Sequence, residues 1–317
     1  MIGNYLVPHL INDGFQVIAT DHVINNNRIK YFSNIGVTYH QVDITRKEDF
    51  EELPKHDIDA VIHLSGIMPA VMNGYTPEKY FMVNAIGTLN LLEYCRAASI
   101  KQIIYTTSHS DMAGYWNDGK AIDPYLPPKY VYGNDHSLYS VSKRAAVEII
   151  KNAYMEFGLE YTVFRCPNIY AWNSPNEYYV NGIKTIVGWK RLIAKALFGE
   201  RLEIWGNAKL RRDLVYIKDL LQMITLALRS SSKNNIFNVS TGVDTSLEEQ
   251  IITIARIFNP ANKKSEIVYC PDKKNGISSH HYDITNAIEI LGYRPRYFVR
   301  EMFEDIKYEM LGSCIKI

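Results

Sequence analysis

Short apolar runs alternate with helical patterns through the first half of this chain. The runs are FQVIAT at 15–20, VTYHQV at 37–42, AVIHL at 60–64, QIIYTT at 102–107 and YTVFRC at 161–166. Strands separated by helix-length patterns are typical of parallel sheets with crossover helices. One such helix is expected at 78–98, where apolar side chains recur at helical spacing. The pattern predicts an α/β fold built on a doubly wound parallel sheet.

The alternation becomes less regular after about residue 170, where asparagine, proline and glycine are frequent. We expect one domain over residues 1–170 and a smaller region, partly interleaved with it, over residues 171–317. LGYRP at 291–295 indicates a helix end followed by a turn.

The charge balance argues against several classes of partner. Lysine and arginine number 35 against 34 acidic residues, so no overall field attracts the chain to nucleic acid or to an anionic membrane. No apolar run approaches the roughly 20 residues of a membrane helix, and no signal-peptide pattern opens the chain. Four widely separated cysteines indicate reduced thiols and no metal site. We expect a cytoplasmic protein without metal.

The segment YSVSK places Tyr139 and Lys143 four residues apart at the start of a helical pattern. At this spacing a phenol and an ammonium share one helix face. The positive charge is expected to lower the tyrosine pKa from about 10, as a general acid/base requires. A surface pair has the same spacing, so the motif alone leaves both interpretations open.

Two further side chains follow predicted strands. Ser108 comes at the carboxyl end of the run at 102–107, the edge where open α/β sheets bind ligands. Asp21 ends FQVIATD, where a carboxylate binds the adenosine ribose hydroxyls of NAD and repels the 2′-phosphate of NADP. The alternatives are a serine that satisfies a turn and an aspartate that caps one.

Taken together, these motifs resemble the extended short-chain dehydrogenases/reductases, in particular the nucleotide-sugar epimerases. The resemblance spans nearly the whole chain and rests on MIGNYLVPHL, VDI at 42–44, HLSG at 63–66, NAIGTLNLLE at 84–93, TTS with YSVSK, RCPNIY and RRDLVYIKDL. It implies a Rossmann-like fold in which the first domain binds NAD and the second region mainly binds substrate. It also implies a homodimer formed by a four-helix bundle.

The resemblance assigns roles to individual residues. The proposed catalytic residues are Ser108, Tyr139 and Lys143. The proposed cofactor contacts are Gly3, Asp21, Asp43, Ile44, Leu64, Ser65, Asn84, Tyr139, Lys143 and Pro167. The proposed substrate contacts are Ser108, His109, Asn168 and Arg212. An arginine's planar donor fork suits a diphosphate.

The sequence departs from the family at its start. The family's phosphate-binding loop follows a first strand and two earlier glycines, whereas here the match begins with Gly3. We expect either a misplaced start codon, which we favour, or a chain that binds its dinucleotide weakly. An upstream extension of about 8–12 residues is then expected to restore binding.

Other departures bear on the substrate. His109 and Ser110 replace the acidic pair of sugar 4,6-dehydratases, which disfavours a dehydratase. Lys273 and Lys274 stand where many epimerases carry arginine. We therefore expect an NAD-dependent nucleotide-sugar epimerase or a related sugar oxidoreductase. The alternatives are a dehydrogenase or reductase of another small alcohol, and a non-catalytic dinucleotide-binding regulatory protein.

Overall fold

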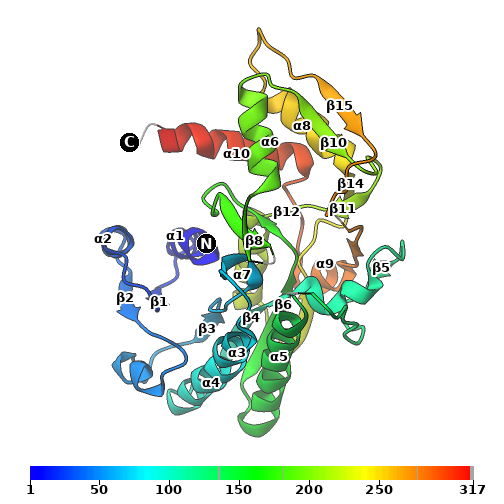
Figure 1. The fold of residues 1–317 in the computed structure, drawn as a ribbon. Coiled ribbons are helices and arrows are strands. Elements are labelled where there is room, and N and C mark those ends of the chain that lie inside the picture. The colour runs from blue at the N-terminus through cyan, green and yellow to red at the C-terminus, as the bar shows by residue number, and fades with distance from the viewer. Residues whose placement is uncertain (135, 181, 277, 315–317) are drawn as a thin grey trace.

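The computed structural model describes residues 1–134, 136–180, 182–276 and 278–314 (Figure 1). Four parallel strands form its main sheet in the order β13–β6–β4–β3. Their bounds are β3 Ala60–His63, β4 Gln102–Ser108, β6 Glu160–Cys166 and β13 Asn235–Asn238. The strands predicted near 60, 102 and 161 are thereby confirmed.

The centre of this sheet is fully enclosed. Ile103, Ile104 and Tyr105 of β4 are 0% exposed, because helices cover both faces of the strand. At the edge of the sheet, Val61 and Ile62 of β3 remain half-buried. Burial therefore falls off toward β3.

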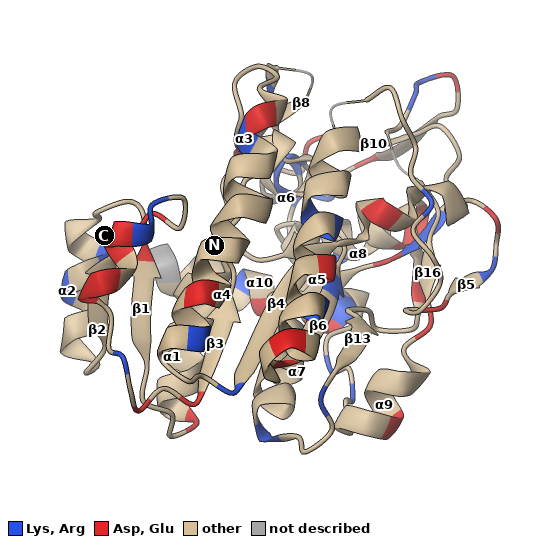
Figure 2. Cartoon of the chain, turned by 90° about the horizontal axis from the view of Figure 1, so that it is seen from below, with Lys and Arg blue, Asp and Glu red and all other residues tan. Residues whose placement is uncertain are grey.

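Two further strands form a separate parallel pair. β1 (Ile18–Asp21) pairs with β2 (Thr38–Gln41), and both confirm predicted strands. Among the described residues neither strand pairs with β3, and Figure 2 shows the pair to one side of the main sheet. One edge of β1 and one edge of β3 thus have no strand partner in the described part of the chain.

Helices cover the two faces of the main sheet. The helices of the first half are α1 (Ile2–Asn12), α2 (Asn26–Asn34), α3 (Pro77–Phe81), α4 (Gly87–Ala97) and α5 (Ser137–Phe157), of which α2 packs on β2 of the separate pair. The helix expected at 78–98 is interrupted by a π-helical turn, η3 (Met82–Ile86), between α3 and α4. These three segments pack against α5. Shared apolar residues include Leu92, Cys95, Val147 and Ile150.

The second half of the chain contributes one strand, β13, to the main sheet and forms further helices and short strands. Its bounds are β7 Ile169–Tyr170, β8 Glu177–Val180, β9 Ile183–Ile186, α6 Gly188–Leu197, β10 Leu202–Trp205, β11 Arg211–Asp213, β12 Val215–Tyr216, α7 Ile217–Arg229, β14 Asp244–Ser246, α8 Leu247–Phe258, β15 Ile267–Cys270, β16 His281–Tyr282, α9 Thr285–Leu291 and α10 Val299–Cys314. β13 joins the main sheet beside β6, and α7 packs on β4.

Short segments complete the chain between these elements. They are the 3₁₀ turns η1 Lys47–Glu52, η2 Pro69–Val71 and η4 His109–Tyr115, and the strand β5 Ala121–Ile122. Gly292 follows α9 with a φ of 69°, which confirms the helix end predicted at LGYRP. None of the described helices combines the length and apolar character needed to cross a membrane.

Candidate active site

The carboxyl ends of β4 and β6 lie side by side. Ser108 ends β4, as predicted, and is in register with Cys166 at the end of β6. The chain then turns into η4, where the Ser108 hydroxyl accepts a hydrogen bond of 3.2 Å from the backbone N–H of Ser110. This cap fixes the direction of the turn that leaves the sheet.

Helix α5 brings Tyr139 and Lys143 to the same place. Both side chains are buried, at 8% and 7% exposure. The Tyr139 ring packs edge-on against Tyr80, with 5.9 Å between the ring centres, and the Ser108 hydroxyl lies near enough to the phenol to lower its pKa. The Nζ of Lys143 lies 4.3 Å from the centre of the Tyr105 ring. The structure therefore brings together the three predicted catalytic residues.

The pKa of Tyr139 differs from the expectation. Burial raises the pKa of the phenol to about 12, and the nearby Ser108 hydroxyl only partly opposes this. Burial also lowers the pKa of Lys143 to about 7, so its ammonium is only partly protonated at neutral pH. The predicted effect of Lys143 on the phenol is outweighed here because two desolvated groups each favour their neutral form.

The loop at Gly66 and Ile67 lies beside the Lys143 ammonium. Within the described residues, Lys143 makes no hydrogen bond. A Cβ added to Gly66 would come within 3.1 Å of the Asn84 Oδ1, which would have to shift by a few tenths of an ångström, and within 3.4 Å of the Lys143 Nζ, an ordinary contact. Asn84 fixes the loop by accepting from the Ile67 N–H at 2.9 Å and donating to its carbonyl at 3.0 Å.

The other predicted cofactor residues lie in three places. Leu64 and Ser65 lead from β3 into the Gly66 loop, and Pro167 is buried after β6. Asp43 accepts from the N–H and hydroxyl of Thr45, which hold its pKa below the usual value although burial acts in the opposite sense. The buried Ile44 packs on Gly87 of α4.

Gly3 and Asp21 belong to the β1–α1 side of the molecule. Gly3 is the second residue of α1, and a Cβ there would meet nothing within 4 Å. The Asp21 carboxylate binds the Arg28 guanidinium of α2 at 2.5 Å. The partner Arg28 was not predictable from the strand pattern, because it lies seven residues after Asp21, within the next helix. Asp21 is therefore a paired carboxylate in this structure.

His109 belongs to a buried aromatic cluster. Its Nδ1 is hydrogen-bonded to the Tyr282 hydroxyl at 2.7 Å, and Trp116 donates to the same hydroxyl at 3.1 Å. The His280 ring meets His109 edge-on, with 5.1 Å between the ring centres. Burial lowers the pKa of His109 well below its usual value and that of His280 to about 4. This aromatic cluster is therefore uncharged at neutral pH.

Arg212 and Asn168 lie further along the same rim. Arg212 is half-buried on β11 and donates to the Tyr170 hydroxyl at 3.0 Å. Its neighbour Asp213 anchors β11 by accepting from the backbone N–H groups of Thr241 and Gly242 at 2.8 and 3.0 Å. Asn168 is exposed in the loop after β6. Arg212 is thus carried by a strand that hydrogen bonds hold in place, whereas Asn168 lies on an exposed loop.

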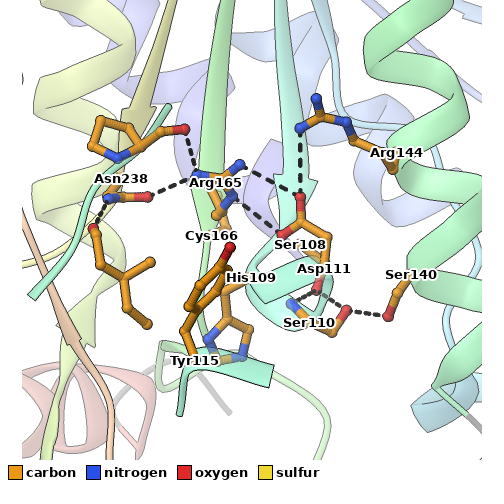
Figure 3. A network of polar contacts seen from close by, with 12 residues as sticks. Ser108, His109, Ser110, Asp111, Tyr115, Ser140, Arg144, Arg165, Cys166 and Asn238 are labelled. Atoms are coloured by element: carbon orange, nitrogen blue, oxygen red, sulfur yellow. Dashed lines mark hydrogen bonds and ion pairs between the residues drawn. The ribbon is translucent and has the colours of Figure 1, made fainter. Parts of the chain in front are cut away.

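A buried ion pair that the sequence analysis missed holds η4 against the sheet (Figure 3). The Arg165 Nε of β6 lies 3.2 Å from the Asp111 Oδ1, and its Nη1 donates to the Pro124 carbonyl at 2.9 Å and the Asn238 Oδ1 at 3.2 Å. Asn238 in turn donates to the Ile122 carbonyl at 2.8 Å. One charged residue within the apolar run YTVFRC was the available clue.

The fold and the convergence of Ser108, Tyr139 and Lys143 define an extended short-chain dehydrogenase/reductase. The sequence profile of the NAD dependent epimerase/dehydratase family matches residues 1–240. Since this match covers more than half of the chain, the protein belongs to that family. It is an enzyme of this family, whose cofactor is NAD.

Named relatives match along most of their length. A putative UDP-glucose 4-epimerase of Methanocaldococcus jannaschii is 27% identical over 301 residues, covering 95% of this chain and 92% of that protein. UDP-glucuronic acid decarboxylase 5 of Arabidopsis thaliana is 25% identical over 321 residues, covering 98% and 87%. The fold is similar to that of UDP-glucose 4-epimerase from Thermotoga maritima, with a TM-score of 0.78, 23% identity and coverage of 99% and 96%.

The residues around Lys143 fit the cofactor of this family. A buried ammonium without a hydrogen-bond acceptor requires a polar partner. The Gly66 backbone approaches that ammonium closely, because it carries no side chain. A ligand that carries hydroxyl groups, such as the ribose of NAD, satisfies both conditions.

Proposed function

We propose that the chain is an NAD-dependent nucleotide-sugar epimerase or a related sugar oxidoreductase. The convergence of Ser108, Tyr139 and Lys143 at the carboxyl end of β4 carries this proposal. The names of the relatives, which act on UDP-sugars, support the substrate class. A regulatory protein has no use for such a proton-transfer set.

In the proposed reaction, Tyr139 takes the proton of a sugar hydroxyl while Ser108 hydrogen-bonds the same oxygen. NAD, when bound, accepts the hydride from the carbon that carries this hydroxyl and can return it. The Lys143 ammonium can then donate a hydrogen bond to a ribose hydroxyl of NAD, and this bond favours the protonated form of the lysine. A charged Lys143 stabilises the phenolate of Tyr139, so occupancy of the site prepares the base.

We assign the remaining predicted contacts to the two ligands. The proposed cofactor contacts are Gly3, Asp21, Asp43, Ile44, Leu64, Ser65, Asn84 and Pro167. His109 faces the uncharged sugar, because its surroundings keep it neutral. Arg212, on its anchored strand, binds the diphosphate, and Asn168 is a further phosphate contact. Residues 1–170 then serve mainly NAD and residues 171–317 mainly the substrate.

We also propose that the chain is a cytoplasmic homodimer. Met82, Ile86 and Leu89 form an exposed stripe along η3 and α4, at 47%, 41% and 42% exposure. An apolar helix face of this kind favours pairing with a second copy. Light scattering at micromolar concentration is expected to give twice the chain mass, and a monomer would contradict the proposal. The free thiols of Cys95, Cys166 and Cys270 suit a reducing compartment.

Replacement of Tyr139 tests the proposed function. Sugar nucleotides are screened with the wild type, and the best substrate is then assayed with Tyr139→Phe. The rate is expected to fall by about 10²–10⁴, because the proton carrier is lost, while NAD affinity stays nearly unchanged. Tyr132→Phe, at an exposed position, is the matched control. Near-normal turnover by Tyr139→Phe would refute the mechanism and point to His109 or His136.

A further inference from the structure

A cavity of about 520 Å³ lies beside Tyr139. Its walls include Pro69, Met72, Tyr75 and Tyr80. The Tyr80 ring also packs edge-on against Tyr139, and Met72, Tyr80 and Tyr139 belong to one apolar cluster. The volume is within the usual range of about 300–1,000 Å³ for small-molecule sites. The cavity is therefore large enough to hold part of a substrate whose reacting oxygen contacts Tyr139.

Three segments that are distant in the sequence enclose this cavity. They are the loop at 69–75, the start of α5 at Ser137 with the turn before it, and Gly182 between β8 and β9. β8 packs on η2, and a Cβ added to Gly182 would lie 3.7 Å from the Gly74 backbone nitrogen. Gly74 and Gly182 have φ angles of 98° and 76°, which favour glycine at both contact points. The second half of the chain thus supplies one wall of the cavity, and the first half supplies the others.

The polar side chains in the wall at the start of α5 already have partners within the protein. The Ser137 hydroxyl accepts from the Asn134 N–H at 3.2 Å and donates to the Val131 carbonyl at 3.2 Å. The Asn134 side chain accepts from the His136 N–H at 2.9 Å and donates to the Val131 carbonyl at 3.1 Å. These bonds hold the turn before α5, so neither side chain requires a polar ligand. The cavity therefore presents mainly apolar and aromatic surface to a ligand.

The cavity also lacks charge. In the described part of the chain, none of the side chains that line it is charged, and the cations Lys143 and Arg212 are not among them. On the hairpin of β8 and β9, Lys184 is already paired with Glu177 at 2.5 Å. An anionic group placed here would lose hydration without gaining a positively charged partner, which is unfavourable. The cavity therefore favours an uncharged group.

We propose that this cavity holds the end of the sugar that is remote from the diphosphate, and that it selects neutral sugars over sugar acids. The diphosphate is attached at C1 of the sugar and is assigned to Arg212, which does not line the cavity, so the opposite end with C6 is the part that can enter it. A hydroxymethyl or methyl group at C6 suits apolar walls, whereas the carboxylate of a hexuronic acid meets no cation. This inference rests on the proposed function, because it takes a nucleotide sugar as the substrate.

Binding measurements on the Tyr139→Phe variant test this inference without requiring turnover. Calorimetry in saturating NAD compares UDP-glucose, UDP-6-deoxyglucose and UDP-glucuronic acid, which differ only at C6. UDP-glucuronic acid is expected to bind at least about tenfold more weakly than UDP-glucose, because its carboxylate has no partner. UDP-6-deoxyglucose should bind at most about tenfold more weakly, since an apolar cavity discriminates little against a missing hydroxyl. Equal or tighter binding of UDP-glucuronic acid, or a greater loss with the 6-deoxy sugar, overturns this inference.

A cation placed in the wall tests where C6 of the sugar lies. Tyr75 lines the cavity and is 54% exposed, so Tyr75→Arg is expected to preserve the fold. In the Tyr139→Phe background it should raise the affinity for UDP-glucuronic acid relative to UDP-glucose at least about tenfold, because an arginine can pair with the carboxylate. Tyr308→Arg, at a 76% exposed position on α10, makes the same change of charge and should leave this ratio unaltered.

The outcomes separate this inference from the proposed function. An unchanged ratio in Tyr75→Arg, or an equal rise in Tyr308→Arg, overturns the assignment of the cavity. Normal turnover by Tyr139→Phe instead overturns the proposed function, so the two failures are distinguishable.

Discussion

The ammonium of Lys143 lies 4.3 Å from the centre of the Tyr105 ring, and the Tyr105 hydroxyl is buried with no hydrogen-bond partner among the described residues. The Tyr105 hydroxyl is thus left unsatisfied within the described part of the chain, and the Lys143 ammonium contacts the face of the Tyr105 ring without a hydrogen bond. Buried groups of this kind destabilise a fold unless a ligand completes them. Stability and function are expected to oppose each other at this position.

Lys143→Met is expected to stabilise the protein in the absence of cofactor. The folded-state pKa of Lys143, about 7, lies below the unfolded value, so its burial is most unfavourable below pH 7 and becomes less so as the pH rises to 10.5. We expect the unfolding free energy at pH 7 to rise on the order of 2–4 kcal/mol, while NAD affinity and turnover fall. Denaturant titration measures the first effect. Lys151→Met, on the same helix, is the control, and an equal gain there would contradict the explanation.

Acidification is expected to destabilise the fold through its buried histidines. Burial and the Lys143 charge lower the pKa of His63 to about 3, so the unfolded state takes up the proton first. Stability is therefore lost as the pH falls from about 6.5 toward 3, by about 1.4 kcal/mol per pH unit for this residue. Unfolding free energies at pH 7 and pH 5 measure the loss.

His63→Phe provides the comparison for this pH dependence. The phenyl ring retains the packing on Tyr105, whose ring centre is 5.0 Å from that of His63. The Thr88 hydroxyl keeps its hydrogen bond to the Asn84 carbonyl at 2.7 Å. The variant should lose less stability than the wild type between pH 7 and pH 5. Identical losses would show that His63 does not titrate as described.

Asp111→Asn is expected to destabilise the protein strongly. Arg165 is buried, and the neutral amide leaves its guanidinium without a counter-charge. Removing one member of a buried ion pair typically costs about 3–5 kcal/mol. Denaturant unfolding provides the measurement. Glu304→Gln, which breaks the exposed pair with Arg300 at 2.8 Å, should leave stability nearly unchanged, and similar losses in both variants would argue against the buried pair as the cause.

Asp21→Ala is expected to shift cofactor preference toward NADP. The wild-type carboxylate holds Arg28 at 2.5 Å, and in the proposed role it repels a 2′-phosphate. Without it, the freed guanidinium can bind that phosphate, so the ratio of NADP to NAD affinity should rise at least about tenfold. Titration with both cofactors gives the dissociation constants. Asp21→Ala/Arg28→Ala should lose the gain, and wild-type protein that prefers NADP would contradict the role of Asp21.

The proximity of Ser108, Tyr139 and Lys143 was predictable because its information is local. Ser108 follows directly from the apolar run of β4, and Tyr139 and Lys143 from one helical spacing. The hydrogen bond between the Ser110 and Ser140 hydroxyls joins residues 30 positions apart and depends on how η4 turns after the strand. Neither spacing nor composition encodes that turn.

The same limit applies to the electrostatics and to the sheet. The pKa of Tyr139 depends on the loss of water around the whole site, which the motif does not report. Three of the four strands of the main sheet, β3, β4 and β6, could be located by their alternation with helices, but the separation of β1 and β2 from β3 is a property of hydrogen bonding between distant segments. Local patterns thus identify elements more reliably than their partners.

The open edges of β1 and β3 also affect how the protein behaves in concentrated solution. Each presents a row of amide and carbonyl groups that no described strand occupies, and β3 carries the apolar sequence AVIH. Such edges are templates for strands of other molecules, and natural proteins usually shield them with charges, bulges or covering segments. Purified protein is therefore expected to aggregate through strand exchange as its concentration rises. Its colloidal stability will depend on these two short edges more than on its nearly balanced surface charge.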